Sequence, residues 1–290
     1  MQVLQIQLQT KMKRLFLICL LSGNFAYAEE CIDRTIGVII PFGINQSAGS
    51  VPAAFTGDFN GGVVLPTEYM EYLQSRNMFK DVVAIKGNAT ADYYIKGYVE
   101  RINYGERISR YLLAPFGAGR SSLEIAVSVL DSKRKLICKQ TISQKARRSG
   151  SPLRSTTWSH EANLQTAIRA TYNDFYTLVL KGVIENEGPN IGSILALENP
   201  ELIRKVSMMV DDGTLLPSKN LAAAYSDLID QYIADPDRYN PASDAIAWVC
   251  MAIGSANMSD NANDLEQLLH ANVSHKIQRL ASDSLDKMDR

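Results

Sequence analysis

The stretch Ala91-Asp-Tyr-Tyr-Ile-Lys-Gly-Tyr-Val-Glu-Arg101 has the alternating character of a β-strand. One face carries Tyr94, Lys96, Tyr98 and Glu100, and the other carries Tyr93, Ile95, Gly97 and Val99. Successive side chains of a strand point to opposite sides of the sheet. Most of the tyrosines in this part of the chain are expected to pack in the core. Tyr94 and Tyr98, which share a face with charged residues, are the candidates for an exposed recognition strip.

Further strands are expected on both sides of this stretch. Residues 33–41 are rich in β-branched side chains and end in proline, which predicts a buried central strand. Residues 82–85 form a short apolar run that predicts another strand. A hairpin is expected over residues 122–144, with its turn at 131–134.

Two helices interrupt this series of strands. Apolar residues recur at helical spacing over 66–79 and again over 156–183. The resulting order is strand, helix, four strands, helix. It predicts an α+β domain over residues 29–185, in which two helices back one face of a mixed sheet.

The remainder of the chain changes character. Residues 185–190 are rich in turn formers, so residues 186–217 are expected to be a linker. A small all-helical domain is expected over 218–290. Its helical segments are 218–234, 242–254, 261–269 and 275–288.

The amino-terminal residues 1–28 have the three parts of a secretory signal peptide. Lys11, Lys13 and Arg14 precede an apolar run, and Ala26 and Ala28 supply the small residues of a cleavage site. Met12 is the expected natural start. No later stretch approaches about 18 uninterrupted apolar residues, so no transmembrane span is expected. We predict a periplasmic protein that is cleaved after Ala28.

The stretch that begins at Ala91 and its continuation resemble the DUF4410 family of exported bacterial proteins over residues 31–183. The matching positions are Asp92, Gly97, Gly117, Gly119, Arg120 and Asp131. The resemblance implies an α+β fold similar to the amino-terminal domain of TolB and to CsgG, in proteins of the cell envelope. It implies no catalytic residues.

The tail over residues 218–288 looks like a HEAT-type helical unit. An apolar helix ends at Gly254, a short helix reads Asp264-Leu-Glu-Gln-Leu-Leu269, and a third helix begins near Lys276. Repeats of this kind need neighbours to bury their apolar faces. Residues 221–233 would supply that cover.

After cleavage the chain holds Cys31, Cys138 and Cys250, an odd number in a compartment that permits disulfides. One disulfide and one buried thiol are expected. Cys31 and Cys138 are the candidate pair, because each lies in or beside a predicted strand. No spacing typical of a metal site occurs, and the net charge of −1 favours no nucleic-acid partner.

Candidate catalytic groups do not converge in the sequence. The glycine-rich turn at 116–120 resembles a phosphate cradle but lacks the Lys-Ser/Thr of a P-loop, so a turn or bulge is the favoured interpretation. No GxSxG elbow and no HExxH motif occur. No catalytic, cofactor-binding or metal-binding residue is predicted, and neither is a cofactor.

We therefore expect a non-enzymatic cell-envelope protein that acts as a protein-interaction or assembly module, with another envelope protein as its partner. Tyr94, Tyr98 and Arg120 are the predicted interaction residues. Basic residues gather over 101–154. They form either a solvated rim of the sheet or a docking face for acidic partners or lipid headgroups, the last with peripheral outer-membrane association. The alternatives are a module that binds a small molecule or envelope polymer, and a hydrolase or transferase using His160 and Glu161.

Overall fold

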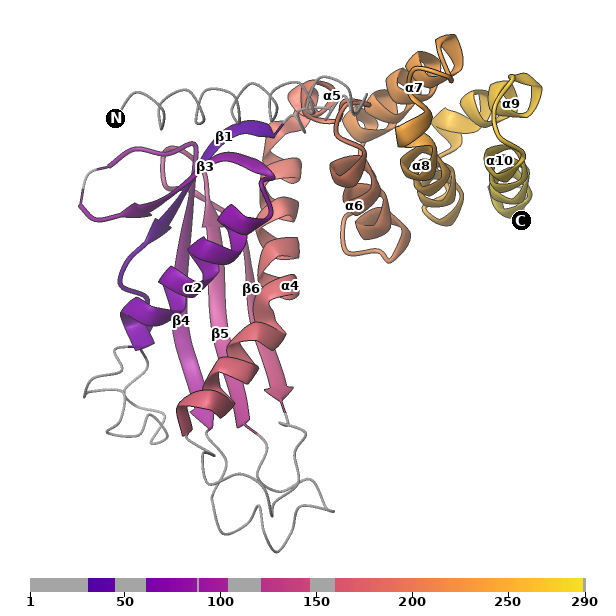
Figure 1. Cartoon of the computed structure of the whole chain (residues 1–290). Helices are drawn as coiled ribbons and strands as arrows, with labels where there is room; N and C mark the ends of the chain where they lie inside the picture. Colours follow the sequence, from indigo (N-terminus) through magenta and orange to yellow (C-terminus); the bar gives the residue numbers. More distant parts are fainter. Residues whose placement is uncertain (1–30, 45–60, 88, 104–120, 147–159, 289–290) are drawn as a thin grey trace, which may run out of the picture. The chain divides into compact units, whose positions relative to one another are not determined.

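The computed structural model describes residues 31–44, 61–87, 89–103, 121–146 and 160–288 (Figure 1). The predicted signal peptide at 1–28 and the turn that contains Arg120 lie outside these residues. No described helix is both long enough and apolar enough to cross a membrane.

β1 (Ile32–Ile39) lies inside a mixed sheet, as its β-branched sequence predicts. The strand order is β3 (Phe79–Ile85), β1, β4 (Tyr93–Asn103), β5 (Ser121–Leu130) and β6 (Leu136–Ala146). β2 (Gly43–Ile44) continues beyond β1 and pairs with β4. β1 is parallel to both of its neighbours, whereas β4, β5 and β6 are antiparallel.

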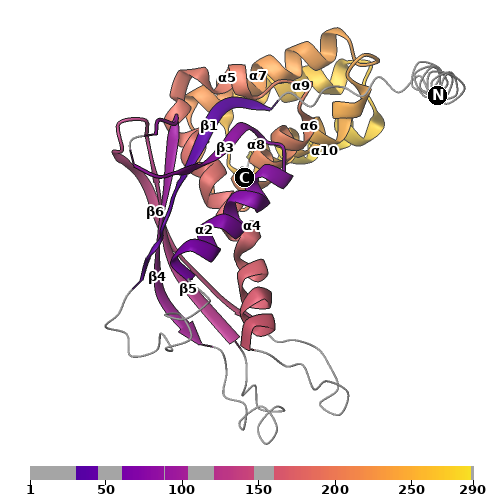
Figure 2. The same ribbon diagram turned by 60° about the vertical axis from the view of Figure 1, so that its left-hand side comes forward.

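Helices α2 (Gly61–Ser75) and α4 (His160–Glu187) cover one face of this sheet (Figures 1 and 2). The two helices pack together through aromatic rings. The rings of Tyr69 and Phe175 stack with their centres 4.1 Å apart. Gly97 of β4 leaves room for the buried Phe42, because a Cβ at Gly97 would lie 2.3 Å from that ring. The predicted α+β class, with two helices behind a mixed sheet, is confirmed.

The chain beyond α4 is entirely helical within the described residues. η4 (Gly188–Asn190) leads into α5 (Ile191–Ile194), α6 (Pro200–Asp211), α7 (Lys219–Ala234), η5 (Asn240–Ala242), α8 (Ser243–Ser255), η6 (Ser259–Asn261), α9 (Ala262–His270) and α10 (His275–Met288). These helices form two layers: α5, α7 and α9 pack in series, and so do α6, α8 and α10 (Figure 1). Each apolar face is buried between neighbours along the series.

The segment 186–217 differs from the predicted linker. It holds the last two residues of α4 together with η4, α5 and α6, and α6 buries Leu202, Ile203 and Val206. The start of α6 is encoded locally. The side chain of Asn199 accepts a hydrogen bond from the amide of Leu202, and Pro200 occupies the first turn. This helix-start signal was present in the sequence.

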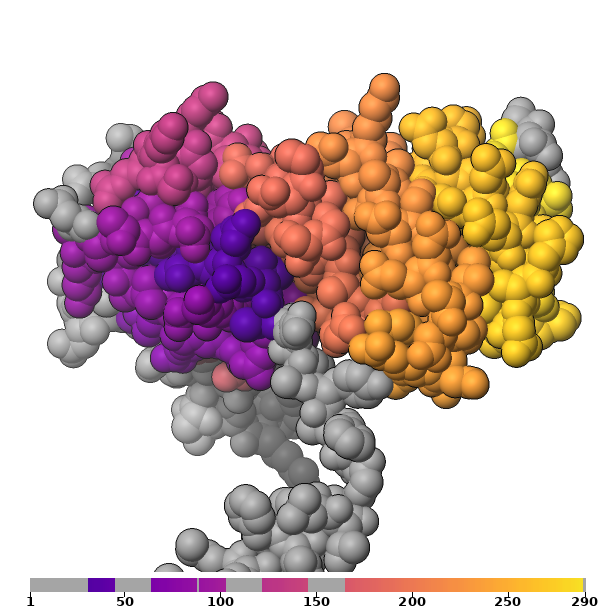
Figure 3. All heavy atoms as spheres, turned by 90° about the horizontal axis from the view of Figure 1, so that it is seen from above, coloured from indigo at the N-terminus to yellow at the C-terminus, as the bar shows by residue number. Residues whose placement is uncertain are grey.

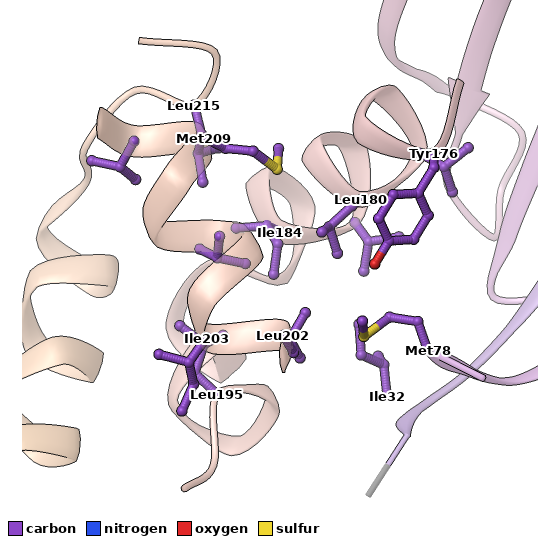
Figure 4. Close-up of a cluster of buried hydrophobic side chains, with 14 of the residues drawn as sticks. Ile32, Met78, Tyr176, Leu180, Ile184, Leu195, Leu202, Ile203, Met209 and Leu215 are labelled. Atoms are coloured by element: carbon purple, nitrogen blue, oxygen red, sulfur yellow. The ribbon is translucent and has the colours of Figure 1, made fainter. Parts of the chain in front are cut away.

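The helical layers and the sheet share one continuous core, and the chain from Cys31 onward forms one compact unit. Figure 4 shows Leu180 and Ile184 of α4 beside Leu202 of α6, with Ile32 and Met78 nearby from the sheet side. Seen from above, the residues around α5 lie between β1 and the later helices (Figure 3). Each fully buried side chain of this size contributes roughly 1.5 to 3 kcal/mol.

Cations and aromatic rings reinforce this junction where α2, α4 and α6 meet. The guanidinium carbon of Arg76 lies 4.9 Å from the ring centre of Tyr72 and 5.9 Å from that of Tyr176. The ammonium of Lys205 lies 5.7 Å from the Tyr176 ring centre. Burial lowers the pKa of Lys205. These contacts hold α6 against α4.

Candidate functional site

The face of the sheet opposite α2 and α4 is the candidate interaction surface. Strand register places its residues in rows across β4, β5 and β6. The rows are Lys96, Ser128 and Lys139; Tyr98, Ala126 and Thr141; and Arg101, Glu124 and Ser143. We call these nine residues the open face. Among the described residues, no helix lies on this side of the sheet (Figure 2).

Tyr98 is the aromatic residue of the open face, and 41% of it is exposed. Its ring lies across β2, because a Cβ placed on Gly43 would be 2.3 Å from the Tyr98 ring. Gly43 and Tyr98 are also register partners. One side of the ring is therefore held by backbone while the other is open, which lowers the entropy that the side chain would lose on binding a partner.

The open face carries more positive than negative side chains. Lys96, Arg101 and Lys139 are exposed, and Glu124 is partly buried. The ion pairs found within the described residues are Arg34–Glu187, Lys80–Asp33, Lys181–Glu185 and Lys276–Asp244. None of them involves the open face, so its cations have no intramolecular carboxylate partner in the described part of the chain.

Tyr94 requires a correction, because only 3% of it is exposed. Its hydroxyl accepts a hydrogen bond from the amide of Ala91 at 3.1 Å and donates one to the carbonyl of Ala89 at 3.3 Å. The guanidinium carbon of Arg134 lies 5.0 Å from the ring centre. The segment before β4 and the β5–β6 turn thus enclose Tyr94. Its contacts hold these two segments against β4. Arg120 lies outside the described residues.

The predicted disulfide between Cys31 and Cys138 also requires a correction, because all three described cysteines are free thiols. Register aligns Cys138 with Val129, Ile95 and then Val38. Cys138 is therefore three strands away from β1, at a level seven residues beyond Cys31. A strand rises roughly 3.3 Å per residue, so the offset of seven residues alone separates the two Cα atoms by far more than the ~7 Å that a disulfide spans.

A buried polar cluster joins the sheet to the end of α4. Arg34 donates to both carboxylate oxygens of Glu187, at 2.6 and 2.8 Å, and the hydroxyl of Tyr93 donates to Glu187 at 2.8 Å. Burial alone would raise the pKa of Glu187, but the hydrogen bonds from Arg34 and Tyr93 outweigh it, and the pKa is lowered. Burial raises the pKa of Tyr93 to about 12.

Sequence reasoning placed Glu187 in the linker and missed this cluster. Its signal was helical spacing, since Glu187 follows Val183 by four residues on the packed side of α4. The cluster fixes the point from which the helical layers leave the sheet.

Metal ligation finds no support in the described ranges, where no group of three or more His, Cys, Asp or Glu side chains is placed to hold an ion. His270 and His275 are both exposed, at the end of α9 and the start of α10. The side chains of His160 and Glu161 lie outside the described residues.

Residues 65–152 match the family model "Domain of unknown function (DUF4410)". This match supports the DUF4410 family resemblance from α2 to beyond β6. A comparison with curated proteins finds no match.

Three DUF4410-motif positions are described, and each has a structural role. A carboxylate oxygen of Asp92 accepts from the amide of Thr35 at 2.7 Å, which ties β4 to β1. Gly97 admits Phe42, as described above. Asp131 accepts from the amides of Lys133 and Lys135 and so shapes the β5–β6 turn. These positions therefore support the fold.

Solved structures similar to parts of this chain include a PelC dodecamer from Paraburkholderia phytofirmans. It covers 50% of this chain and 91% of its own, with 14% identity and a TM-score of 0.31. A putative neuraminyllactose-binding hemagglutinin homolog from Helicobacter pylori covers 62% of this chain and 92% of its own, with 14% identity and a TM-score of 0.26. Likeness at this level carries no argument about function. The likeness to TolB and CsgG and the HEAT-type assignment stay predictions.

Proposed function

We propose that this chain is a non-enzymatic periplasmic protein of the cell envelope that acts as a protein-interaction or assembly module. The observation that supports this proposal is the exposed Tyr98 on the open face. Its ring is held by the backbone of β2 and flanked by cations that form no ion pair with the described carboxylates. Aromatic side chains that lose little entropy on binding often dominate the energy of protein interfaces.

The open face would supply the centre and the charged rim of such an interface. Tyr98 provides apolar area with a polar tip, and the cations around it provide orientation toward an acidic partner surface. The helical layers supply a second contact surface. The periplasmic address rests on the signal peptide predicted at residues 1–28.

Site-specific crosslinking in intact cells tests this function. Tyr98→benzoylphenylalanine is expected to crosslink to another protein chain after illumination. The same replacement at Leu216, a more exposed apolar residue on the α6–α7 loop, is expected to give little product. Osmotic-shock fractionation of the same cells is expected to place the chain in the periplasmic fraction.

A truncation variant gives the matching energetic test. Tyr98→Ala should weaken capture of the crosslinked partner about tenfold, since an interface residue of this kind contributes about 1 to 2 kcal/mol. Leu216→Ala serves as the control and should leave capture unchanged. Equal crosslinking from both positions, or capture that does not respond to Tyr98→Ala, would contradict the proposed role of the open face.

A further inference from the structure

The charges of this chain are balanced overall but are divided strongly between two segments. Residues 132–160 contain eight Lys and Arg residues and no Asp or Glu. Residues 220–275 contain eight Asp and Glu residues and a single cation, Arg238. The same division holds at larger scale. Residues 31–187 carry nineteen cations and fourteen anions, whereas residues 188–290 carry eight cations and fifteen anions.

The described cations of the first segment lie on the β5–β6 hairpin at one edge of the sheet. This basic hairpin consists of Lys133, Arg134, Lys135, Lys139 and Lys145, all exposed. Within the described residues none of them forms an ion pair with a carboxylate. β6 pairs only with β5 in the described sheet, so its other edge presents unpaired backbone donors and acceptors beside these cations.

The acidic segment forms one layer of the helical part. Asp227 and Asp230 are exposed on α7, Asp260 is exposed on η6, and Glu266 is exposed on α9. We call these four residues the acidic layer. α7 packs against both η6 and α9, so the carboxylates belong to neighbouring elements of one layer. In the part of the chain that the structure describes, none of the four is in an ion pair.

We propose that a second copy of this chain covers the basic hairpin and the adjoining open face with its acidic layer. The inference rests on the proposed function and names its partner. Each copy carries both complementary surfaces, and no ion pair within the described chain joins them. Pairing between two copies would neutralise the charge of both the basic hairpin and the acidic layer. Complementary charge supplies specificity and a faster encounter, and most assemblies of soluble proteins join identical chains.

The predicted contact should depend steeply on salt. Exposed charges are screened beyond about 8 Å at physiological ionic strength and beyond about 3 Å in 1 M salt. Sedimentation velocity of the purified chain from residue 29 onward is expected to show assemblies larger than the monomer at about 50 mM salt. The same chain should return toward the monomer at about 500 mM salt.

Charge reversal tests which surfaces are used. Two double variants should each weaken self-association at least about tenfold. The first reverses charges on the hairpin, Lys139→Glu with Lys145→Glu, and the second reverses charges on the acidic layer, Asp227→Lys with Asp230→Lys. Mixing the two double variants should restore association, because the reversed hairpin of one matches the reversed layer of the other. Arg279→Glu with Lys287→Glu on α10, two exposed cations that are in no ion pair within the described residues, is the control and should leave association unchanged. Circular dichroism confirms that every variant is folded.

Three results would overturn the inference. The first is a chain that stays monomeric at low salt. The second is association that does not respond to either reversal or is not restored by mixing. The third is binding of the basic hairpin to vesicles of anionic phospholipid without self-association. In each case, crosslinking from Tyr98 to a different envelope protein would leave the proposed function standing, so the two failures can be told apart.

Discussion

Tyr94 and Tyr98 lie four residues apart on the same face of β4, yet only Tyr98 of the two is accessible to a partner. Tyr94 is enclosed because the β5–β6 turn brings Arg134 over its ring and the segment before β4 bonds its hydroxyl. The ring of Tyr98 lies beside Gly43, which has no side chain to cover it. A difference in neighbours, and not in residue type, therefore selects the interaction residue.

Glu187→Gln is predicted to destabilise the folded chain. The variant keeps the shape of the side chain but leaves Arg34 without its carboxylate, and Arg34 is only partly exposed. Removing one partner of a buried pair leaves an uncompensated charge, and we expect a loss on the order of 3 kcal/mol in the free energy of unfolding. Urea denaturation followed by circular dichroism measures this loss in the free energy of unfolding. Glu185→Gln, two residues away on the exposed side, should change stability by less than about 0.5 kcal/mol.

The pH dependence of this effect has a definite sign. The pKa of Glu187 is lowered in the folded chain, so its contribution is fully present above the pKa of an unfolded glutamate, about 4.3. The contribution disappears as pH falls through the folded pKa. The stability difference between the wild type and Glu187→Gln should therefore be largest near neutral pH and should shrink below about pH 4. A difference that grows on acidification would contradict the ionised pair.

Helices α8 and α10 pack closely together at Gly254. A Cβ at this position would lie 2.6 Å from the Cβ and 2.8 Å from the Cα of Ser284. Ser284 donates a hydrogen bond to the carbonyl of Cys250 at 2.7 Å, which couples the two helices at the same point. The small residues thus set the distance between the helices.

Gly254→Ala is predicted to destabilise the helical layers, although alanine favours a helix by about 1 kcal/mol over glycine. The added methyl group meets backbone, which cannot rotate away, and we expect a net cost of about 1 to 3 kcal/mol. Urea denaturation of the variant tests this expectation. Gly192→Ala on α5 is the control, since a Cβ there would be 3.9 Å from its nearest atom, and it should be neutral or slightly stabilising. Equal effects at both positions would show that the close approach of α8 and α10 at Gly254 does not determine the stability of the helical layers.

The continuous core between sheet and helices predicts that both parts unfold together. The thiols of Cys138 in β6 and Cys250 in α8 report the two parts separately. Burial raises the pKa of Cys138 to about 11 and that of Cys250 to about 12. Both should resist thiol reagents until the surrounding structure opens.

In a Cys31→Ser chain, which lacks the exposed thiol, Cys138 and Cys250 are expected to become reactive at the same urea concentration. Pulse labelling followed by mass spectrometry of the two peptides measures this. Labelling of Cys250 at clearly lower urea would mean that the helical layers open independently of the sheet. That result would contradict the coupling through Leu180, Ile184 and Leu202.

Local periodicity was sufficient to predict the sheet strands other than β2, the hairpin, the two long helices and the four helices from α7 to α10. These patterns depend on residues two to four positions apart, which the sequence displays directly. Alternation along β4 also predicted that Lys96 and Tyr98 share one face of the sheet. It did not predict the place of Arg101, because a register shift between Val99 and Arg101 pairs Arg101 with Glu124.

Contacts between distant segments decided which side chains are buried and which segments pack together. The order of strands separates Cys31 from Cys138, the turn at Arg134 covers Tyr94, and the buried side chains of α6 make residues 186–217 part of the packed structure. Strand order and burial follow from which surfaces meet between segments tens of residues or more apart in the sequence, and no local pattern encodes that meeting.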